Sequence, residues 1–502
     1  MKVRLLSVGT LLMVSALGLN AQTTTPKFRR SAVYSIMVHS DAMDQQLKEK
    51  SSNTGNVITD LVKSKQGENK EVDPAVVKEL FPSIAIPQQF TDFNLATRVI
   101  EYDEYGITED DIKAADESAS GTKKKKKGFG ALAGKALGAA VGGLDMSNLP
   151  MKPGTDEVTK GIKALAIKFF AKENTAANLV AKWYNYSDST TDGSHYNMNT
   201  ITDNGIYAIS AEDKRKFEAS GEANSLFIDD AVNLIGHTYV MFNYFKYRSN
   251  AAIIAEMQAY ADAIGSMGGS LGVIASKAAG MAASLIAGDG YSVQTNTFLY
   301  RLDWSEDTNT EFYKKCWNGT IEDLINSGIC KLTFVGNEKS RAGVRVSAFS
   351  KTSSNDLLKR AVLRSLDENI ANLQSEHEDF RTLAPITGVD VNNGEIYAEI
   401  GLRENLAPKD EYEVLQPVED AEGKITYKSV GKFSPVEGQI YDNRVGAAEE
   451  IKEDLQSTDA KVKEAAEAVN GLTKTVFKGS KVKEEYAGCY LRLTKKAKSK
   501  KK

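Results

Sequence analysis

The stretch that decides the fold is Thr238–Tyr247, which has the sequence TYVMFNYFKY. Its β-branched and aromatic residues are those enriched in strands, so we expect a strand here. A second run of this kind, Tyr291–Trp304 (YSVQTNTFLYRLDW), is its expected partner, and a long Gly/Ala segment with helical spacing joins the two. Strands and helical patterns therefore occur together in this chain, and we predict an α+β fold.

Further elements extend this pattern in both directions. Upstream, we expect strands at Ala32–His39 and Thr97–Tyr102. Helical periodicity predicts helices over about 156–186 and over Ser353–Glu378. The central part of the chain therefore reads as a helical and stranded domain.

The last 120 residues change character, because short strands recur between turn signals such as Asn392-Asn393-Gly394. We expect these strands at Gly388–Val391, Glu395–Ile400, Glu411–Leu415, Ile425–Val430 and Gly438–Tyr441. Five strands at this spacing predict a small closed or half-closed β-barrel. A helix over Ala447–Val469 and a strand pair, Thr473–Phe477 with Tyr486–Leu493, would complete it.

The composition is that of an ordinary globular protein, with 502 residues of which 41 % are hydrophobic and 26 % charged. At about 150 residues per domain, the length predicts two to four domains. Collagen-like, wholly disordered and multi-span membrane proteins do not fit this composition. Only 10 Pro and 4 His occur, so there is little material for histidine-rich catalytic or metal sites.

The N-terminus has the features of a secretory signal peptide. Lys2 and Arg4 precede an apolar stretch, Leu5–Leu19, and Ala21 is followed by polar residues. We expect cleavage after Ala21 and an exported mature chain. No cysteine stands at the cleavage point, which excludes lipoprotein processing.

The three cysteines must then be considered in an oxidising compartment. Cys316 and Cys330 could pair, which would leave Cys489 over, or all three could be partly buried structural thiols. The sequence leaves this alternative open.

Two lysine-rich blocks stand out from an acidic body. The formal net charge is −4; removal of the two basic residues of the signal peptide takes it to about −6, and the blocks carry a further eleven positive charges. The blocks consist of Lys123, Lys124, Lys125, Lys126, Lys127, Lys495, Lys496, Lys498, Lys500, Lys501 and Lys502. They are either solvated runs or a basic patch for lipid headgroups or another anionic surface, whereas an acidic exported body does not fit nucleic acid.

Two Gly/Ala segments carry small residues at every fourth position, which lie on nearly one face of a helix. The ladder residues are Gly130, Gly134, Gly138, Gly142, Gly268, Gly272, Ser276, Gly280, Ser284 and Gly288. The pattern resembles the glycine zipper of membrane-associated and self-assembling proteins. A buried helical hairpin, membrane insertion or assembly into a homo-oligomer, and a flexible loop remain as alternatives. A single span is disfavoured, since the first segment has about 16 residues and the second contains Lys277.

Motifs for catalysis are weak throughout the chain. Gly268-Gly269-Ser270-Leu271-Gly272 fits G-x-S-x-G, but it lies within a small-residue helix pattern instead of between a strand and a helix. The four histidines, His39, His195, His237 and His377, have no metal-ligand spacing. We therefore predict a non-enzyme with no cofactor, no metal site and no catalytic residues.

The C-terminal part carries a family resemblance. Ile400-Gly401-Leu402, Asp410–Leu415, the hairpin at Gly423 and Val430-Gly431 are similar to the small SH3-like β-barrel of flagellar and curli-type outer-membrane assembly proteins. The run Pro435–Arg444 (PVEGQIYDNR) resembles C-terminal segments of uncharacterised exported bacterial proteins. The resemblance implies a Gram-negative envelope setting, in the periplasm, at the outer membrane or at the cell surface.

These observations predict six parts: a signal peptide (1–21), an N-terminal α+β region (22–120), a lysine block with the first ladder (121–155), a central α+β domain with the second ladder (156–380), a C-terminal small β-barrel module with a helix (381–494) and a basic tail (495–502). The predicted function is that of a non-catalytic envelope-associated structural or assembly protein with envelope proteins or an anionic membrane surface as partners. The alternatives are a secreted hydrolase and a membrane-inserting or pore-forming protein.

Overall fold

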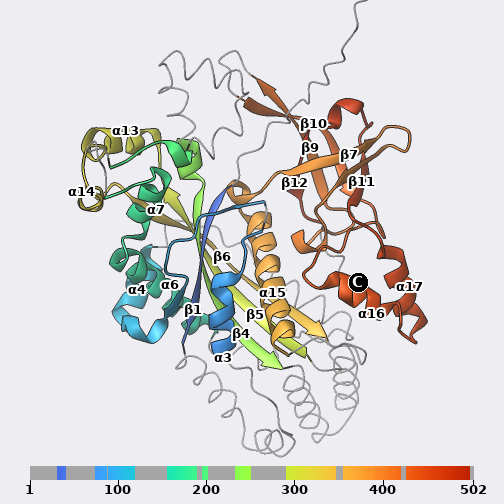
Figure 1. Ribbon diagram of the computed structural model, residues 1–502, viewed down its shortest axis with the longest axis horizontal. Coiled ribbons are helices and arrows are strands. Elements are labelled where there is room, and N and C mark those ends of the chain that lie inside the picture. Colours follow the sequence, from blue (N-terminus) through green and yellow to red (C-terminus); the bar gives the residue numbers. More distant parts are fainter. Residues whose placement is uncertain are drawn as a thin grey trace, which may run out of the picture.

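The computed structural model describes residues 31–40, 74–87, 89–118, 155–188, 195–201, 232–249, 290–345, 354–419 and 425–497. In these ranges the chain forms a mixed β-sheet with helices on both faces, followed by a second group of strands at the C-terminus (Figure 1). The α+β prediction is confirmed.

The centre of the sheet is the predicted strand pair. β4 (Thr238–Ser249) and β5 (Gly290–Asp303) run antiparallel, in register from Tyr239 opposite Arg301 to Ser249 opposite Tyr291. β6 (Lys331–Arg345), which the sequence did not predict, pairs antiparallel with β5.

The other edge of β4 pairs in parallel with β1 (Ala32–His39), and β1 pairs in parallel with the short strands β2 (Thr91–Asp92) and β3 (Val99–Glu101). The order is β2-β1-β4-β5-β6, with β3 also on β1. The regions predicted as N-terminal (22–120) and central (156–380) therefore share one sheet.

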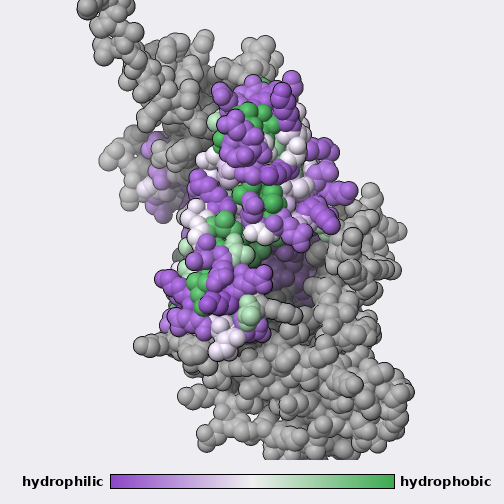
Figure 2. Space-filling view, turned by 90° about the vertical axis from the view of Figure 1, so that its right-hand side faces the viewer, coloured by the Kyte–Doolittle hydropathy of each residue, from purple (hydrophilic) through white to green (hydrophobic). Residues whose placement is uncertain are grey.

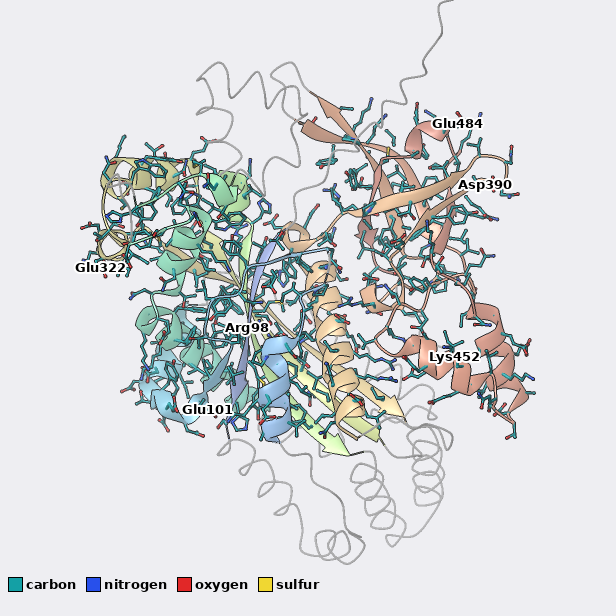
Figure 3. The ribbon with its side chains drawn as sticks, viewed as in Figure 1. Arg98, Glu101, Glu322, Asp390, Lys452 and Glu484 are labelled. Carbon is teal, nitrogen blue, oxygen red and sulfur yellow. The ribbon has the colours of Figure 1, made fainter. Side chains whose placement is uncertain are left out.

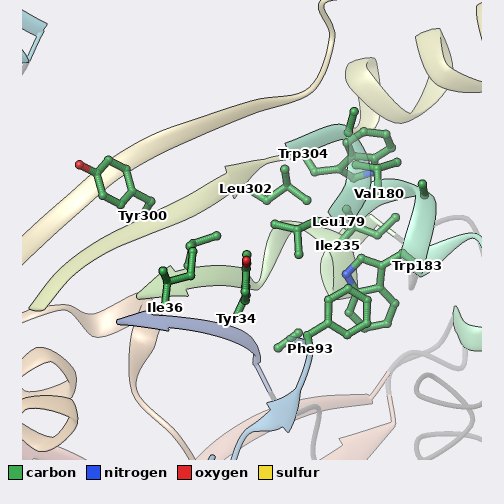
Figure 4. Close-up of a cluster of buried hydrophobic side chains, with 14 of the residues drawn as sticks. Tyr34, Ile36, Phe93, Leu179, Val180, Trp183, Ile235, Tyr300, Leu302 and Trp304 are labelled. Carbon is green, nitrogen blue, oxygen red and sulfur yellow. The ribbon is translucent and has the colours of Figure 1, made fainter. Parts of the chain in front are cut away.

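Alternate residues of each strand pack on opposite faces, as the pleat requires. On one face, Tyr34, Ile36 and Phe242 join a core that includes the stacked rings of Phe93 and Trp183 (Figure 4). Helices on this face are α6 (Thr155–Lys172), α7 (Thr175–Trp183), α13 (Glu306–Lys315) and α14 (Ile321–Ser327), with α4 (Glu109–Ser118) packed against α6.

On the other face, Val33, Met37 and Met241 pack against α3 (Pro74–Leu80) and α15 (Ser354–Glu376). The predicted helix over 353–378 is confirmed as α15. The predicted helix over 156–186 is two helices, since Asn174 is in the left-handed region with φ 46° and ends α6 before α7 begins.

A chain of buried polar side chains fixes α15 on the sheet. Asn243 donates to Ser35 Oγ at 3.0 Å and accepts from Thr297 Oγ1 at 2.8 Å, and Asn369 of α15 donates to Thr297 Oγ1 at 2.7 Å. Buried polar groups that hydrogen-bond one another specify a unique packing. The register of α15 on β1, β4 and β5 is therefore set by these bonds as well as by apolar contact.

The C-terminal strands are joined by ladders that run from β10 to β11, β8, β7, β12, β9 and back to β10. We call β7–β12 the C-terminal ring. Its strands are β7 (Ala384–Asp390), β8 (Glu395–Ala398), β9 (Glu411–Glu419), β10 (Ile425–Pro435), β11 (Thr475–Gly479) and β12 (Tyr490–Lys495).

Three predictions in this part were wrong. The strands predicted as a pair at Thr473–Phe477 and Tyr486–Leu493 do not pair with each other, because β11 pairs with β10 and β8, and β12 pairs with β7 and β9. The segment Gly438–Tyr441 is not a strand, because Gly438 takes φ +79° in a turn that Val436, Gln439 and Val476 close with backbone hydrogen bonds. The predicted helix over 447–469 is a pair, α16 (Ala447–Asp454) and α17 (Ala460–Val469).

Short 3-10 turns complete the described chain: η1 (Phe81–Ser83), η2 (Tyr102–Tyr105), η5 (Glu378–Phe380), η6 (Leu402–Glu404) and η7 (Glu484–Tyr486). Among the helices in these ranges, none has the length and apolar character needed to cross a membrane.

Candidate functional site

Two faces of helix α15 contact other parts of the chain: one packs on the sheet, and the other contacts η6, α16 and the loop before α16, which join strands of the C-terminal ring (Figure 1). Its apolar stripe faces the sheet, whereas Arg360, Arg364 and Asp367 recur at helical spacing on the opposite side. These three side chains bind residues of η6, of α16 and of the loop before α16. We call this contact the α15–ring junction, and it is the most extensive polar arrangement that we find among the described residues.

The strongest contact of the junction joins Asp367 to Arg403 of η6. Arg403 Nε lies 2.8 Å from Asp367 Oδ2, and Nη2 lies 3.0 Å from Oδ1, so the pair is bidentate. The Asp367 side chain is only 6 % exposed. Burial raises the pKa of Asp367 to about 6, although Arg403 acts in the opposite direction.

Arg364 is the second anchor, and its side chain is 7 % exposed. Its Nε and Nη2 donate to the carbonyl oxygen of Val445 at 2.9 and 2.6 Å, and Nη1 lies 2.8 Å from Glu450 Oε1 on α16. Arg360 reaches Glu449 at 3.7 Å. A planar guanidinium with several fixed donors can hold a carbonyl and a carboxylate at once.

The loop before α16 holds the backbone of Arg403 in place through hydrogen bonds. Asn443 Oδ1 accepts the backbone N–H of Arg403 at 2.8 Å, and its amide donates to Glu404 Oε2 at 2.8 Å. Glu404 Oε2 in turn accepts the N–H of Gly401 at 2.7 Å. The segment PVEGQIYDNR therefore has a structural role, which is to hold η6 against α15.

A buried ion pair lies where β9 begins and β12 ends. Asp410 is fully buried; it accepts from Lys496 Nζ at 2.7 Å and from the backbone N–H groups of Ala407 and Ala497, each at 2.8 Å. Lys496, which we assigned to the basic patch, thus forms an ion pair with Asp410 inside the protein. Its charge is neutralised there and does not contribute to binding an anionic surface. Lys495 is the last residue of β12 and is exposed.

A second polar cluster lies at the carboxyl ends of the parallel strands β1 and β3, where α/β sheets commonly place functional groups. His39 Nδ1 lies 2.6 Å from Glu101 Oε2, and Lys78 Nζ lies 2.5 Å from Glu101 Oε1. Figure 3 shows Glu101 at the end of the sheet away from the C-terminal ring. Burial raises the pKa of Glu101, but Lys78 and His39 outweigh it, so the net shift is downward.

This cluster offers a substrate little access from the described surface, since the His39 side chain is 6 % exposed. Within the described parts of the chain, no group of three or more His, Cys, Asp or Glu side chains could hold a metal ion. His195 and His237 bind the carbonyl oxygens of Ser187 and Asn233 through Nδ1.

Most predicted site residues lie outside the described ranges: all ten ladder residues, Lys123–Lys127, and Lys498, Lys500, Lys501 and Lys502. The G-x-S-x-G run at 268–272 also lies outside them. The cysteines lie within, and all three are free thiols, Cys316 and Cys489 buried and Cys330 partly buried.

Sequence analysis missed the junction. Its signal was present, because Arg360, Arg364 and Asp367 form a charged stripe opposite the apolar stripe of a long helix. Such a stripe normally faces solvent, and nothing in the sequence pointed to Arg403 as its partner. A comparison of the chain with protein-family models finds no match, and a comparison with curated proteins finds none either.

Proposed function

We propose that this protein is a non-catalytic, exported, envelope-associated structural or assembly protein that acts through contacts with envelope proteins or with an anionic membrane surface. The observation that carries the proposal is the α15–ring junction. Its arginines and carboxylates bind one another across two parts of the chain. These charged groups hold α15, α16 and η6 in a fixed arrangement, which is what a scaffold requires, and they bind one another instead of a substrate.

The surface of the C-terminal part supports a role in contacts with polar partners. The face turned toward the viewer in Figure 2 is mainly hydrophilic, with small hydrophobic spots between the charged residues. Lys452 on α16 belongs to this part of the molecule (Figure 3). A face on which hydrophobic residues are scattered among charged ones, as in this view, fits reversible association better than an obligate apolar interface.

We further propose that the C-terminal ring is a small SH3-like β-barrel module. The continuous circuit of ladders through β7–β12 supports this, as does a core of Ile396, Val414, Phe433 and Phe477 enclosed by the strands. Small barrels of this kind present loops around a rigid wall and are suited to protein contacts. The lysines that follow Ala497 lie outside the described residues, and we propose that they bind the anionic partner.

Fractionation of the native host combined with crosslinking tests the proposal. The mature chain should be found with the envelope, should begin at Gln22 or within a few residues of it, and should crosslink to envelope proteins. Recovery of the intact chain from the cytoplasm, with Met1 present, would overturn the localisation, and crosslinks confined to the chain itself would overturn the assembly role.

One observation favours a second function, a secreted hydrolase. The pair of His39 and Glu101 at the carboxyl ends of β1 and β3 has the geometry of a histidine oriented by a carboxylate. An activity panel on the full chain and on His39→Gln decides this: turnover that disappears in the variant would support the hydrolase, and its absence from both would support the scaffold.

A further inference from the structure

We propose that the side chains of Asp410 and Lys496 condense in the folded chain, so that an amide bond replaces their ion pair and one water molecule is lost. The two residues lie where β9 begins and β12 ends. This inference goes beyond the proposed function, since the reaction needs neither a partner nor an oxidising compartment. The resulting isopeptide crosslink joins the end of β12 covalently to the turn that leads into β9.

The reacting groups are held in contact by several hydrogen bonds. Lys496 Nζ lies 2.7 Å from Asp410 Oδ2, and it also donates to the carbonyl oxygen of Asn405. The carboxyl group is fixed from the other side, because the N–H of Ala407 donates to Oδ2 and the N–H of Ala497 donates to Oδ1, each at 2.8 Å. Two groups that are held together in this way react as if at a very high concentration.

The pair is screened from solvent. The Asp410 side chain is 0 % exposed, and the Lys496 side chain is 15 % exposed. On either side of Asp410 in the chain, Leu406 and Tyr412 are buried in the core of the C-terminal ring. Two opposite charges are costly in such surroundings, so the neutral amine and the neutral acid are more accessible here than in water.

Burial also makes the amine a better nucleophile. It lowers the pKa of Lys496, although Asp410 acts in the opposite direction. A lysine attacks a carbonyl carbon only as the neutral amine, and a lowered pKa makes that form easier to reach. The proton that leaves Nζ has an acceptor in contact, which is Asp410 Oδ2.

The turn that carries Asp410 has an unusual backbone. Lys409 takes φ 76° and Asn405 takes φ 56°, both in the left-handed region. Asparagine tolerates this region, whereas a lysine there is strained. In the part of the chain that the structure describes, Lys409 is the one residue with positive φ that is neither glycine nor asparagine. Strain of this kind clusters at functional sites, and here it lies directly beside the residue that meets Lys496.

The reaction balances without an oxidant or a further reactant. A proton passes from Nζ of Lys496 to Oδ2 of Asp410, and the neutral amine then attacks Cγ. The C–N bond forms, and the carbonyl electron pair moves to Oδ1, where the N–H of Ala497 stabilises the negative charge. The nitrogen then gives a second proton to Oδ2, the Cγ–Oδ2 bond breaks, and Oδ2 leaves as water while the carbonyl re-forms.

The burial of this pair sets it apart from other lysine–carboxylate pairs. In every other such pair between described residues, the lysine side chain is at least 35 % exposed. One of these, Lys432 with Glu411, has a similar N–O distance of 2.9 Å, but its lysine is 67 % exposed. Water keeps both charges solvated there, so we expect it to remain an ion pair.

The test is the intact mass of the folded full chain, Gln22 to Lys502, measured after unfolding in urea with a reductant. The account predicts a mass lower than that of the sequence by one water molecule. Lys496→Arg is the matched control: it keeps a positive charge beside Asp410, but a guanidinium does not lose its proton and cannot attack. It should have the full mass, whereas Lys495→Arg should still lose the water.

Peptide mapping then places the bond. Trypsin should release residues 410–424 joined to residues 496–498, since an acylated lysine is not cleaved. An intact mass equal to that of the sequence would overturn the proposal, and so would a water loss that maps to another position or persists in Lys496→Arg. These results concern the crosslink alone, whereas envelope fractionation tests the proposed function separately.

Discussion

Arg403 and Asp367 form a bidentate ion pair across the α15–ring junction, with N–O distances of 2.8 and 3.0 Å, although the two residues are separated by 36 positions in the chain. Asp367 lies on a helix that packs on the central sheet, and Arg403 lies in η6 beside the C-terminal ring. This ion pair therefore connects α15, which packs on the central sheet, to η6 in the C-terminal part of the chain.

Removal of one partner of this pair should destabilise the protein strongly. Asp367→Asn leaves the guanidinium of Arg403, whose side chain is 24 % exposed, without its counter-ion, and loss of one partner of a buried pair costs at most about 3–5 kcal/mol. Urea unfolding of the variant measures the loss. Lys432→Ala, which removes an exposed pair with Glu411, is the control and should change little. Equal stability of Asp367→Asn and the parent chain would show that the junction is not a structural joint.

Two partly buried glutamates should make stability depend on pH. Burial raises the pKa of Glu368 to about 7 from 4.5, and burial together with Glu376 does the same for Glu338. Since the folded-state pKa values are raised, the stabilisation from these groups is fully present below pH 4.5 and is lost as the pH rises through about 7.

Glu368→Gln and Glu338→Gln remove this dependence. Each variant should therefore gain more stability over the parent chain at pH 8 than at pH 5, as measured by thermal melts at both values. Glu437→Gln changes an exposed glutamate and should show no such difference. A gain that is the same at pH 5 and pH 8 would argue against carboxyl groups with a raised pKa at these two positions.

The lysines at the C-terminus should separate into two functions. Lys496→Ala removes the partner of the fully buried Asp410 and should lower stability by about 3–5 kcal/mol. Deletion of residues 498–502 should leave the melting temperature unchanged and weaken binding to anionic vesicles, more so at low salt, because exposed charges are screened over about 8–10 Å at physiological salt. Vesicle binding that is insensitive to both the deletion and the salt would assign these lysines to solvation alone.

Gly401 should not accept a side chain. A Cβ at this position would collide with the carbonyl oxygen of Tyr441 and approach Asn443 Oδ1 at 2.8 Å. Gly401→Ala should therefore cost about 1–3 kcal/mol by overpacking and should loosen η6, which carries Arg403. Glu399→Ala, at a position with a side chain 64 % exposed, is the nearby control. Denaturation curves that rank the two variants equally would exclude a tight contact at Gly401.

The glycine ladders yield a prediction from the sequence. If Gly138 and Gly280 each face a second helix backbone, a leucine at either position should destabilise the fold or break an assembly, since side chains larger than Ala push helices apart. Ala278→Leu, off the ladder, should be milder. Melting temperatures and size-exclusion chromatography of the three variants test this prediction. If leucine at both Gly138 and Gly280 changed neither the melting temperature nor the elution volume, the glycine-zipper hypothesis would be wrong.

Local pattern predicted the elements that are rich in β-branched and aromatic residues, and it failed where contacts are distant. β4 and β5 were predicted because they are rich in β-branched and aromatic residues, which favour strands. β6 was missed, since Lys331–Arg345 mixes glycine and charged residues along an edge strand. The parallel pairing of Ala32 with Thr238 joins positions about 200 residues apart, and no periodicity encodes such a partner.

The α15–ring junction was not predicted either, because its partners are also distant in the sequence. Arg364 and Asp367 look like solvent-facing charges on a helix until the loop at Val445 and the turn at Arg403 are brought to them. Lys496 looked like part of a mobile basic tail, because its partner Asp410 stands 86 positions away. Sequence alone assigns charge to a run of residues, and only the fold shows which charges are neutralised internally.

The central claim is that this chain is an envelope scaffold, and crosslinking mass spectrometry on the native host's envelope fraction tests it most directly. The account predicts crosslinks from exposed lysines of the C-terminal part, such as Lys495 and Lys452, to other envelope proteins, and none of these from Lys496, which is held by Asp410. Absence of the chain from the envelope fraction, or its presence there without a crosslink to any other protein, would contradict the account.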